Sequence, residues 1–206
     1  IGSESNDNLA SEKLVAYELG YRIQPNKKLS IDVTGYYNDY SKLFAEEYGA
    51  VTSMGSYFYL PVNSKSTNKA HSWGFEAATK YNVSSTWQLA ATYSYIDLKF
   101  DNKASIAFNL VGKTPKNIFN LRSTYTFPNK LEMTNSLYTV SKLSGINIPG
   151  YQRLDTRFSY PLTDSVSISL VGQNLLDKRH KEFTPFTYQT QTEIGRSVYA
   201  GVSYKF

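Results

Sequence analysis

Three charged residues at alternate positions form the most suggestive chemical motif of the chain. Arg153, Asp155 and Arg157 lie two residues apart, and residues two apart on a β-strand point to the same face. Such a row could bind an anion or contact the polar surface of an inserted domain. It could equally form a charge-paired wall with neighbouring strands. Both alternatives place the row on a face that water can reach.

Histidine and cysteine are too scarce for a recognisable metal or catalytic site. The only histidines are His71 and His180, and their separation in sequence lacks the spacing of a known metal site. A hydrolase triad needs a nucleophile, a base and an orienting acid, and neither histidine lies in such a motif. Cysteine is absent, which excludes disulfides and cysteine ligands. We therefore expect no enzyme, no cofactor and no metal held by protein side chains.

Aromatic residues gather in two polar segments, residues 42–70 and residues 177–192. Exposed rings there could stack on a flat or aromatic ligand. Alternatively, they could continue the flanking strands and pack on each other. The candidate ligand-binding residues are Tyr48, Tyr57, Phe58, Tyr59, Phe183, Phe186 and Tyr188.

Between these segments, apolar and polar residues alternate with period two, which predicts β-strands with two unlike faces. The clearest run begins at Val198 and stops at the last residue, Phe206. Short turns alternate with longer polar segments, and we expect about nine antiparallel strands. The expected short turns follow residues 24, 83, 127 and 161. The expected loops are residues 1–11, 42–70 and 101–112, a shorter one after residue 143, and the segment after residue 177. The edges of the 42–70 loop are expected to continue the flanking strands.

The lengths of the turns and loops and the placement of aromatic residues favour a membrane barrel over a soluble sandwich. Short turns at one end and longer loops at the other are typical of outer-membrane barrels. Aromatic residues near the expected strand ends resemble interfacial belts: Tyr21, Trp87, Tyr95, Phe127 and Tyr160. The expected lipid-facing set is Val166, Ile168, Leu170, Val198, Ala200, Val202 and Tyr204. The expected lumen-facing set is Ser167, Ser169, Gln173, Ser197, Tyr199 and Ser203.

Four stretches of the chain resemble the TonB-dependent outer-membrane receptors. They are residues 11–22, residues 154–157, residues 173–178 with Glu182 and Phe183, and residues 196–206. The resemblance implies an antiparallel transmembrane β-barrel of the 22-strand, plugged class. Residues 1–206 would form its carboxy-terminal portion, with the plug domain and the TonB-contacting segment upstream. An odd strand count agrees with a portion, because single-chain bacterial barrels have even counts.

The resemblance also implies a function in the bacterial outer membrane. Such receptors bind a scarce nutrient, most often a ferric siderophore, and import it with energy supplied through TonB. The implied partners are outer-membrane lipid, the TonB complex acting through the plug, and the nutrient. The alternative function is a passive pore or a purely structural barrel.

The two ends of the chain carry further expectations. Phe206 resembles the aromatic carboxy-terminal signal read by the barrel-assembly machinery, although it could be only an interfacial anchor. The first residues lack the basic start and apolar stretch of a signal peptide, so we expect any such signal upstream. The net charge of +5 is spread along the chain, and we expect no nucleic-acid partner.

Overall fold

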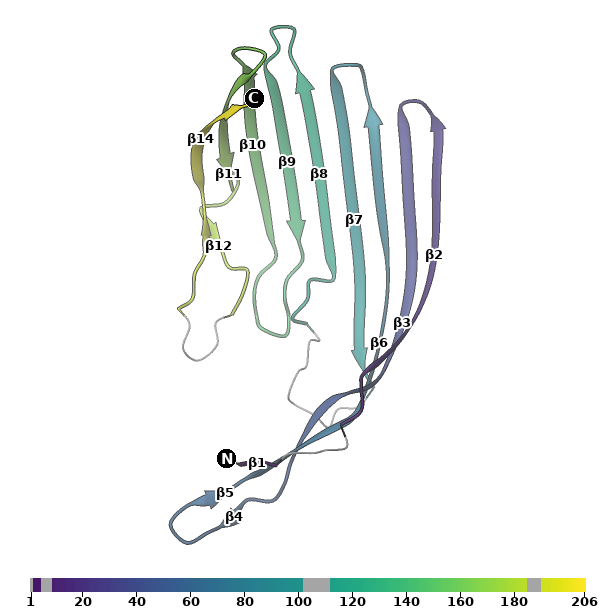
Figure 1. Ribbon diagram of the computed structural model, residues 1–206, viewed down its shortest axis with the longest axis vertical. Helices are drawn as coiled ribbons and strands as arrows, with labels where there is room; N and C mark the ends of the chain where they lie inside the picture. The colour runs from purple at the N-terminus through teal and green to yellow at the C-terminus, as the bar shows by residue number, and fades with distance from the viewer. Residues whose placement is uncertain (1, 5–8, 102–111, 185–189) are drawn as a thin grey trace.

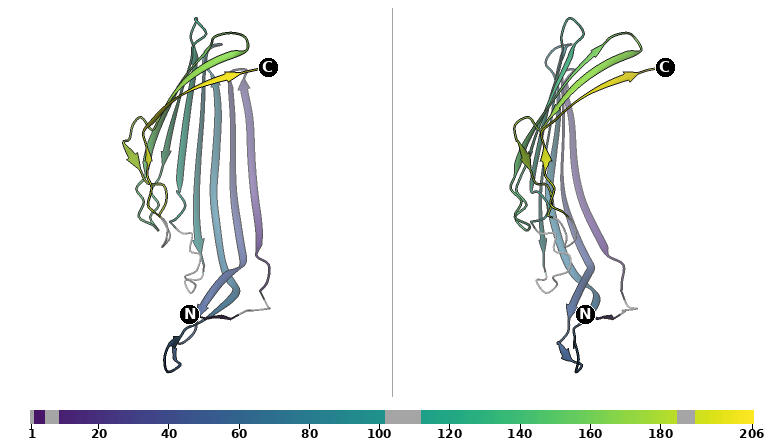
Figure 2. Two further views of the ribbon diagram at one scale, coloured as in Figure 1. Left: turned by 60° about the vertical axis from the view of Figure 1, so that its left-hand side comes forward. Right: turned by 90° about the vertical axis from the view of Figure 1, so that its left-hand side faces the viewer.

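Nine long strands form one antiparallel, curved and open sheet (Figure 1, Figure 2). The structure, a computed structural model, describes residues 2–4, 9–101, 112–184 and 190–206. Each long strand pairs with its neighbours along the chain, which confirms the expected number and antiparallel order. The long strands are β2 (Lys13–Asn26), β3 (Leu29–Tyr48), β6 (Pro61–Asn82), β7 (Trp87–Phe100), β8 (Asn117–Thr126), β9 (Glu132–Val140), β10 (Tyr151–Pro161), β11 (Val166–Gln173) and β14 (Ser197–Tyr204). Within these ranges, no helix is long and apolar enough to cross a membrane.

The described residues also form five short strands. They are β1 (Gly2–Glu4), β4 (Thr52–Ser53), β5 (Phe58–Tyr59), β12 (Arg179–His180) and β13 (Ile194–Gly195). β1 pairs with β6, β4 with β5, and β12 with β13. The four tight turns that connect the long strands lie together at the top of Figure 1, and the longer connections lie at the other end. We call this other end the outer end, as expected for an outer-membrane barrel.

The pairing register carries each face of the sheet from strand to strand. Ile168 on β11 pairs with Val202 on β14 and with Tyr160 on β10. Ser169, its neighbour, pairs with Gly201 on the opposite face. Paired residues of an antiparallel ladder point to the same side, so the two sets expected from the sequence occupy opposite faces.

Aromatic residues form two belts on the apolar face. The belt toward the outer end contains Trp73 on β6 and Tyr95 on β7. The belt near the tight turns contains Tyr81 on β6 and Trp87 on β7. The register places Tyr81 beside Leu89 and Phe75 beside Tyr95, all on one face. A separation of about eight residues is ~26 Å along a strand, or roughly 20 Å along the membrane normal after the usual tilt. The belts therefore bracket a band of the height that a membrane barrel presents to lipid.

Charged residues begin directly beyond the belt at the outer end. Asp39, His71 and Lys99 form one register row on the same face as the aromatic residues. Asp97 is buried and accepts a hydrogen bond from Lys116, which precedes β8. This hydrogen bond and the charge of Asp97 raise the pKa of Lys116. The apolar band thus ends at the outer aromatic belt.

β3 and β6 continue past the other strands as a paired arm. Their pairing extends to Tyr48 and Val62, with register shifts between Tyr40 and Ala45. Residues 42–70 were expected as a long loop whose edges continue the flanking strands, and the edges do continue them, so that only residues 49–60 connect the two strands. Backbone hydrogen bonds hold such a ladder even where the side chains are polar. Figure 1 shows the arm bending below the sheet, with β4 and β5 at its tip.

The two chain ends also depart in part from expectation. Residues 1–11 were expected as a loop, but Gly2–Glu4 pairs in parallel with residues 61–63 of the arm. At the other end β14 stops at Tyr204, and Phe206 follows it fully exposed, with its ring centroid 6.4 Å from that of Tyr204. Of the expected loop at 101–112, residues 102–111 lie outside the described residues.

Candidate functional site

Arg153 and Asp155 form a two-pronged ion pair on β10. Arg153 Nε donates to Asp155 Oδ1 at 2.8 Å, and Arg153 Nη2 donates to Asp155 Oδ2 at 2.6 Å. The guanidinium also lies 5.6 Å from the ring centroid of Tyr138, its register partner on β9. The spacing of two residues puts both charges on one face, as the sequence predicts. The ion pair forms within one strand, so the expectation of pairing with neighbouring strands is wrong for these residues.

Arg157, the third member of the row, behaves differently. Its Nη2 donates a long hydrogen bond of 3.4 Å to Ser159 Oγ. In the part of the chain that the structure describes, it forms no ion pair. The row therefore divides into a neutralised pair toward the outer end and one available cation toward the tight turns. Contact of this row with a plug stays a prediction.

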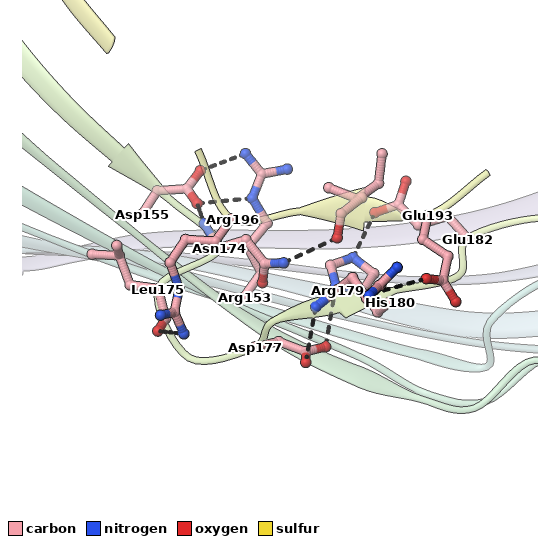
Figure 3. Close-up of polar contacts among 11 residues, drawn as sticks. Arg153, Asp155, Asn174, Leu175, Asp177, Arg179, His180, Glu182, Glu193 and Arg196 are labelled. Atoms are coloured by element: carbon pink, nitrogen blue, oxygen red, sulfur yellow. Dashed lines mark hydrogen bonds and ion pairs between the residues drawn. The ribbon is translucent and has the colours of Figure 1, made fainter. Parts of the chain in front are cut away.

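Asp155 also fixes the segment that follows β11 (Figure 3). Its Oδ1 accepts a hydrogen bond of 3.0 Å from the backbone N of Asn174. Asn174 is fully buried with φ of 54°, a left-handed conformation that asparagine tolerates better than most residues. Its Nδ2 donates to the backbone O of Ile194 at 3.1 Å. The Asn174 side chain thus bonds across the whole outer segment.

His180 anchors the same segment to β10. Its ring stacks on that of Tyr151, with centroids 3.9 Å apart and an interplanar angle of 13°. Its Nε2 lies 3.1 Å from Glu182 Oε1. Its Nδ1 lies 3.5 Å from Asp177 Oδ2, which is long for a hydrogen bond and is an ion pair only if the ring is protonated. Among the described residues there is no group of three or more His, Asp or Glu that could hold a metal.

The candidate ligand-binding aromatics fall into two groups. Tyr48, Tyr57 and Phe58 lie exposed on the arm, with 73% of Phe58 accessible, whereas Tyr59 is half-buried. Residues 48–62 of the arm contain no charged side chain. Phe183 lies exposed on the segment that connects β12 to β13. It is thus carried by a different pair of strands from the arm of β3 and β6. The other two candidates, Phe186 and Tyr188, lie outside the described residues.

Sequence reasoning missed the contacts that shape this end of the molecule. Asn174 contacts Ile194 and His180 contacts Tyr151, and neither Ile194 nor Tyr151 was expected from the sequence to take part. Asn174 itself lies in residues 173–178, one of the stretches named above. An asparagine directly after a strand is a usable sequence signal for a side chain that bonds to the backbone. Its far partner follows only from the register of β12 with β13.

Comparison with known families is decisive for the fold. A sequence profile described as TonB dependent receptor-like, beta-barrel, matches residues 1–175. The chain belongs to the TonB-dependent receptor β-barrel family. TonB-dependent receptors are receptors and transporters of the bacterial outer membrane that bind ligands and TonB. The open sheet is therefore the fold of a barrel wall.

Solved TonB-dependent receptors share the arrangement of the sheet. The FrpB iron transporter from Neisseria meningitidis matches 99% of this chain and 33% of its own, at 13% identity and a TM-score of 0.74. The pyoverdine outer membrane receptor FpvA from Pseudomonas aeruginosa PAO1, bound to pyoverdine, matches 98% and 31%, at 18% identity and 0.72. The copper transporter OprC matches 97% and 33%, at 17% identity and 0.72. This chain thus spans about a third of the structures it matches.

Proposed function

We propose that these strands form the carboxy-terminal wall of a plugged active-transport receptor that imports a scarce nutrient, a ferric siderophore, with energy coupled through TonB. The observation that carries this proposal is the arm of β3 and β6. It projects beyond the outer aromatic belt and presents Tyr57 and Phe58 exposed on an uncharged tip. An arm placed there meets solutes outside the cell before they reach the barrel mouth.

The chemistry of the arm suits a metal chelate. Large apolar rings that are exposed and free of neighbouring charge can stack on the flat conjugated groups of a chelator. The metal would then be held by the organic ligand, which agrees with the scarcity of protein metal ligands. Among the structural relatives, FrpB is an iron transporter and OprC is a copper transporter, which supports a metal chelate as the nutrient class.

The width of such a barrel supports the presence of a plug. A barrel of the 22-strand class encloses a lumen wide enough to leak solutes unless it is filled. The lumen face of this sheet carries ionisable side chains in mid-strand, among them Glu76 and Arg122. Such a wall can contact a polar domain without the cost of burying bare charge in an apolar interface. We propose that this domain and the remaining strands complete the receptor.

The test uses the complete receptor, purified and inserted in vesicles. Replacement of both Tyr57 and Phe58 by alanine is expected to weaken binding of the cognate ferric siderophore about tenfold or more, since each aromatic contact contributes roughly 0.5–1.5 kcal/mol. Replacement of both Val51 and Met54 by alanine is the matched control, because these exposed side chains lie on the same tip but lack rings. Equal loss in both variants would contradict stacking.

A second measurement separates active transport from a passive pore. Uptake of the radiolabelled chelate into cells is expected to require TonB, and the complete receptor is expected to be silent in planar bilayers. Spontaneous ion conductance, or uptake unaffected by loss of TonB, would contradict the proposed function.

A further inference from the structure

Four cationic side chains surround one open hollow at the outer end of β14. The hollow has a volume of about 750 Å³, and Lys178, Arg179, Lys181 and Arg196 contribute to its lining. Glu193 is the single acidic residue among the described lining residues. A surface of this composition attracts groups that carry more than one negative charge.

The cations stand on a fixed backbone. β12 and β13 pair Arg179 with Gly195, and the backbone N of Arg196 donates to the backbone O of Lys178 at 3.2 Å. The stacked His180 and the Asn174 bond to Ile194 hold this small hairpin to β10 and β11. The backbone that carries the cationic residues is therefore set by strand pairing and by the buried neighbours Asn174 and His180, although the cationic side chains are exposed.

Most of the positive charge is not neutralised within the chain. Arg179 Nε lies 3.5 Å from Glu193 Oε2, and the Arg179 side chain is largely exposed. Arg196 Nη2 donates to the backbone O of Leu175 at 2.9 Å, which orients the guanidinium without cancelling its charge. In the described ranges, Lys178 and Lys181 have neither a hydrogen-bonding nor an ion-pairing side-chain partner. The hollow thus holds a surplus of cations on a fixed backbone.

The hollow lies directly beyond the lipid-facing stripe of β14. Arg196 precedes the strand by one residue, and Val198, the first residue of the stripe, is 66% exposed. The Leu175 side chain lies against Gly172, the register partner of Val198 on the same face. Leu176 beside it is also exposed. Cations immediately above exposed apolar side chains are the pattern of a membrane–water boundary.

We propose that Lys178, Lys181 and Arg196 bind the phosphate groups of a lipid head group in the outer leaflet. Arginine offers a planar fork that matches phosphate, and lysine offers a point charge that neutralises it. The acyl chains of the same lipid would lie along Leu176, Val198 and the stripe below. The lipid site is separate from the aromatic arm and independent of the nutrient that the receptor imports.

The experiment measures lipid retention by the complete receptor in nanodiscs. The discs contain a neutral phospholipid with a trace of fluorescent lipid A carrying two phosphates, or of the same lipid A after enzymatic removal of both phosphates. Lys178→Gln/Lys181→Gln is expected to reduce retention of the phosphorylated lipid at least fivefold and to leave the dephosphorylated lipid unaffected. Lys178→Arg/Lys181→Arg is expected to restore retention.

The matched control removes equal charge at the other end of the strands. Lys27→Gln/Lys205→Gln replaces two exposed lysines near the tight turns and is expected to retain lipid A as the unmodified receptor does. Equal loss in the control, or equal retention of both lipids by the unmodified receptor, would overturn the proposal. Binding of inorganic phosphate at the hollow without retention of lipid A would also overturn it, since the oxyanion would then come from a free solute.

Discussion

The side-chain amide of Asn174 donates a hydrogen bond to the backbone oxygen of Ile194 over 3.1 Å. The bond joins the residue that follows β11 to the short strand that precedes β14, although 20 residues separate them. Because Asn174 is fully buried, water cannot replace the bond without opening the structure. The outer segment is therefore closed at its base.

This closure predicts the behaviour of two variants at one position. Asn174→Gly keeps the backbone at φ of 54° without strain but removes the bond, whereas Asn174→Ala removes the bond and adds about 1–2 kcal/mol of left-handed strain. We expect trypsin to cleave the segment after Lys178 or Arg179 faster in the glycine variant, and faster still in the alanine variant. Limited proteolysis of intact cells measures the rates. Unchanged rates in both variants would show that the bond does not close the segment.

Asp155 and Arg157 share a face of β10 but should differ in their contribution to stability. Asp155 accepts from Arg153 and from the backbone of Asn174, so Asp155→Ala leaves a partly buried guanidinium without its partner. We expect a loss of about 1.5–3 kcal/mol in the free energy of unfolding. Arg157→Ala should change it by less than about 0.5 kcal/mol, since the residue makes one long bond. Guanidinium unfolding in vesicles measures both, and similar losses would contradict the assignment.

Gly74 is predicted to be irreplaceable, whereas Gly35 on the neighbouring strand is not. A Cβ on Gly74 would lie 2.5 Å from the Tyr36 hydroxyl and would also collide with the backbone oxygen of Tyr95. A Cβ on Gly35 would meet only the Gly74 oxygen, at 4.0 Å. We expect Gly74→Ala to lower the yield of folded receptor several-fold and Gly35→Ala to leave it unchanged. Heat-modified mobility on gels measures folding, and equal yields would show that the strands move apart cheaply.

The orientation of the sheet can be tested with two adjacent residues of β11. Leu170 lies on the apolar face and Ser169 on the polar face. Leu170→Arg is expected to cost about 2–4 kcal/mol of insertion, as for a cation facing lipid near the bilayer centre. Ser169→Arg should cost little, because its side chain enters the wet lumen. Spontaneous folding into vesicles measures both, and the reverse order would place lipid on the other face.

Deletion of Phe206 tests whether this residue is an assembly signal or only an interfacial anchor. The residue follows β14 and is fully exposed, so loss of its ring removes little packing and at most a few kcal/mol of burial in lipid. We expect deletion of Phe206 from the complete receptor to reduce surface levels sharply while the inserted fraction melts as before. Quantitative immunoblotting of outer-membrane fractions is the measurement. Normal levels would leave Phe206 as an anchor only.

Local alternation along the sequence is enough to assign the two faces of the sheet, and short polar connections are enough to place its turns. Alternation is a local property, because each residue of a strand points opposite to its neighbour whatever the strand pairs with. Ile168 and Ser169 could therefore be assigned to opposite faces without any knowledge of β14. The tight turns were equally accessible, since short polar connections between alternating runs are read from adjacent residues.

Tertiary structure decided what the polar residues contact. Arg153 could pair along its strand or across it, and the choice depends on rotamers that packing beside Tyr138 selects. How far β3 and β6 extend into residues 42–70 was not readable from the polar side chains there, because backbone pairing in a ladder leaves no strong mark on composition. The contacts of His180 with Tyr151 and of Asn174 with Ile194 join residues 20 or more positions apart. Such contacts exist only once the register of neighbouring strands is set, and a one-residue slip would have turned these side chains to the other face.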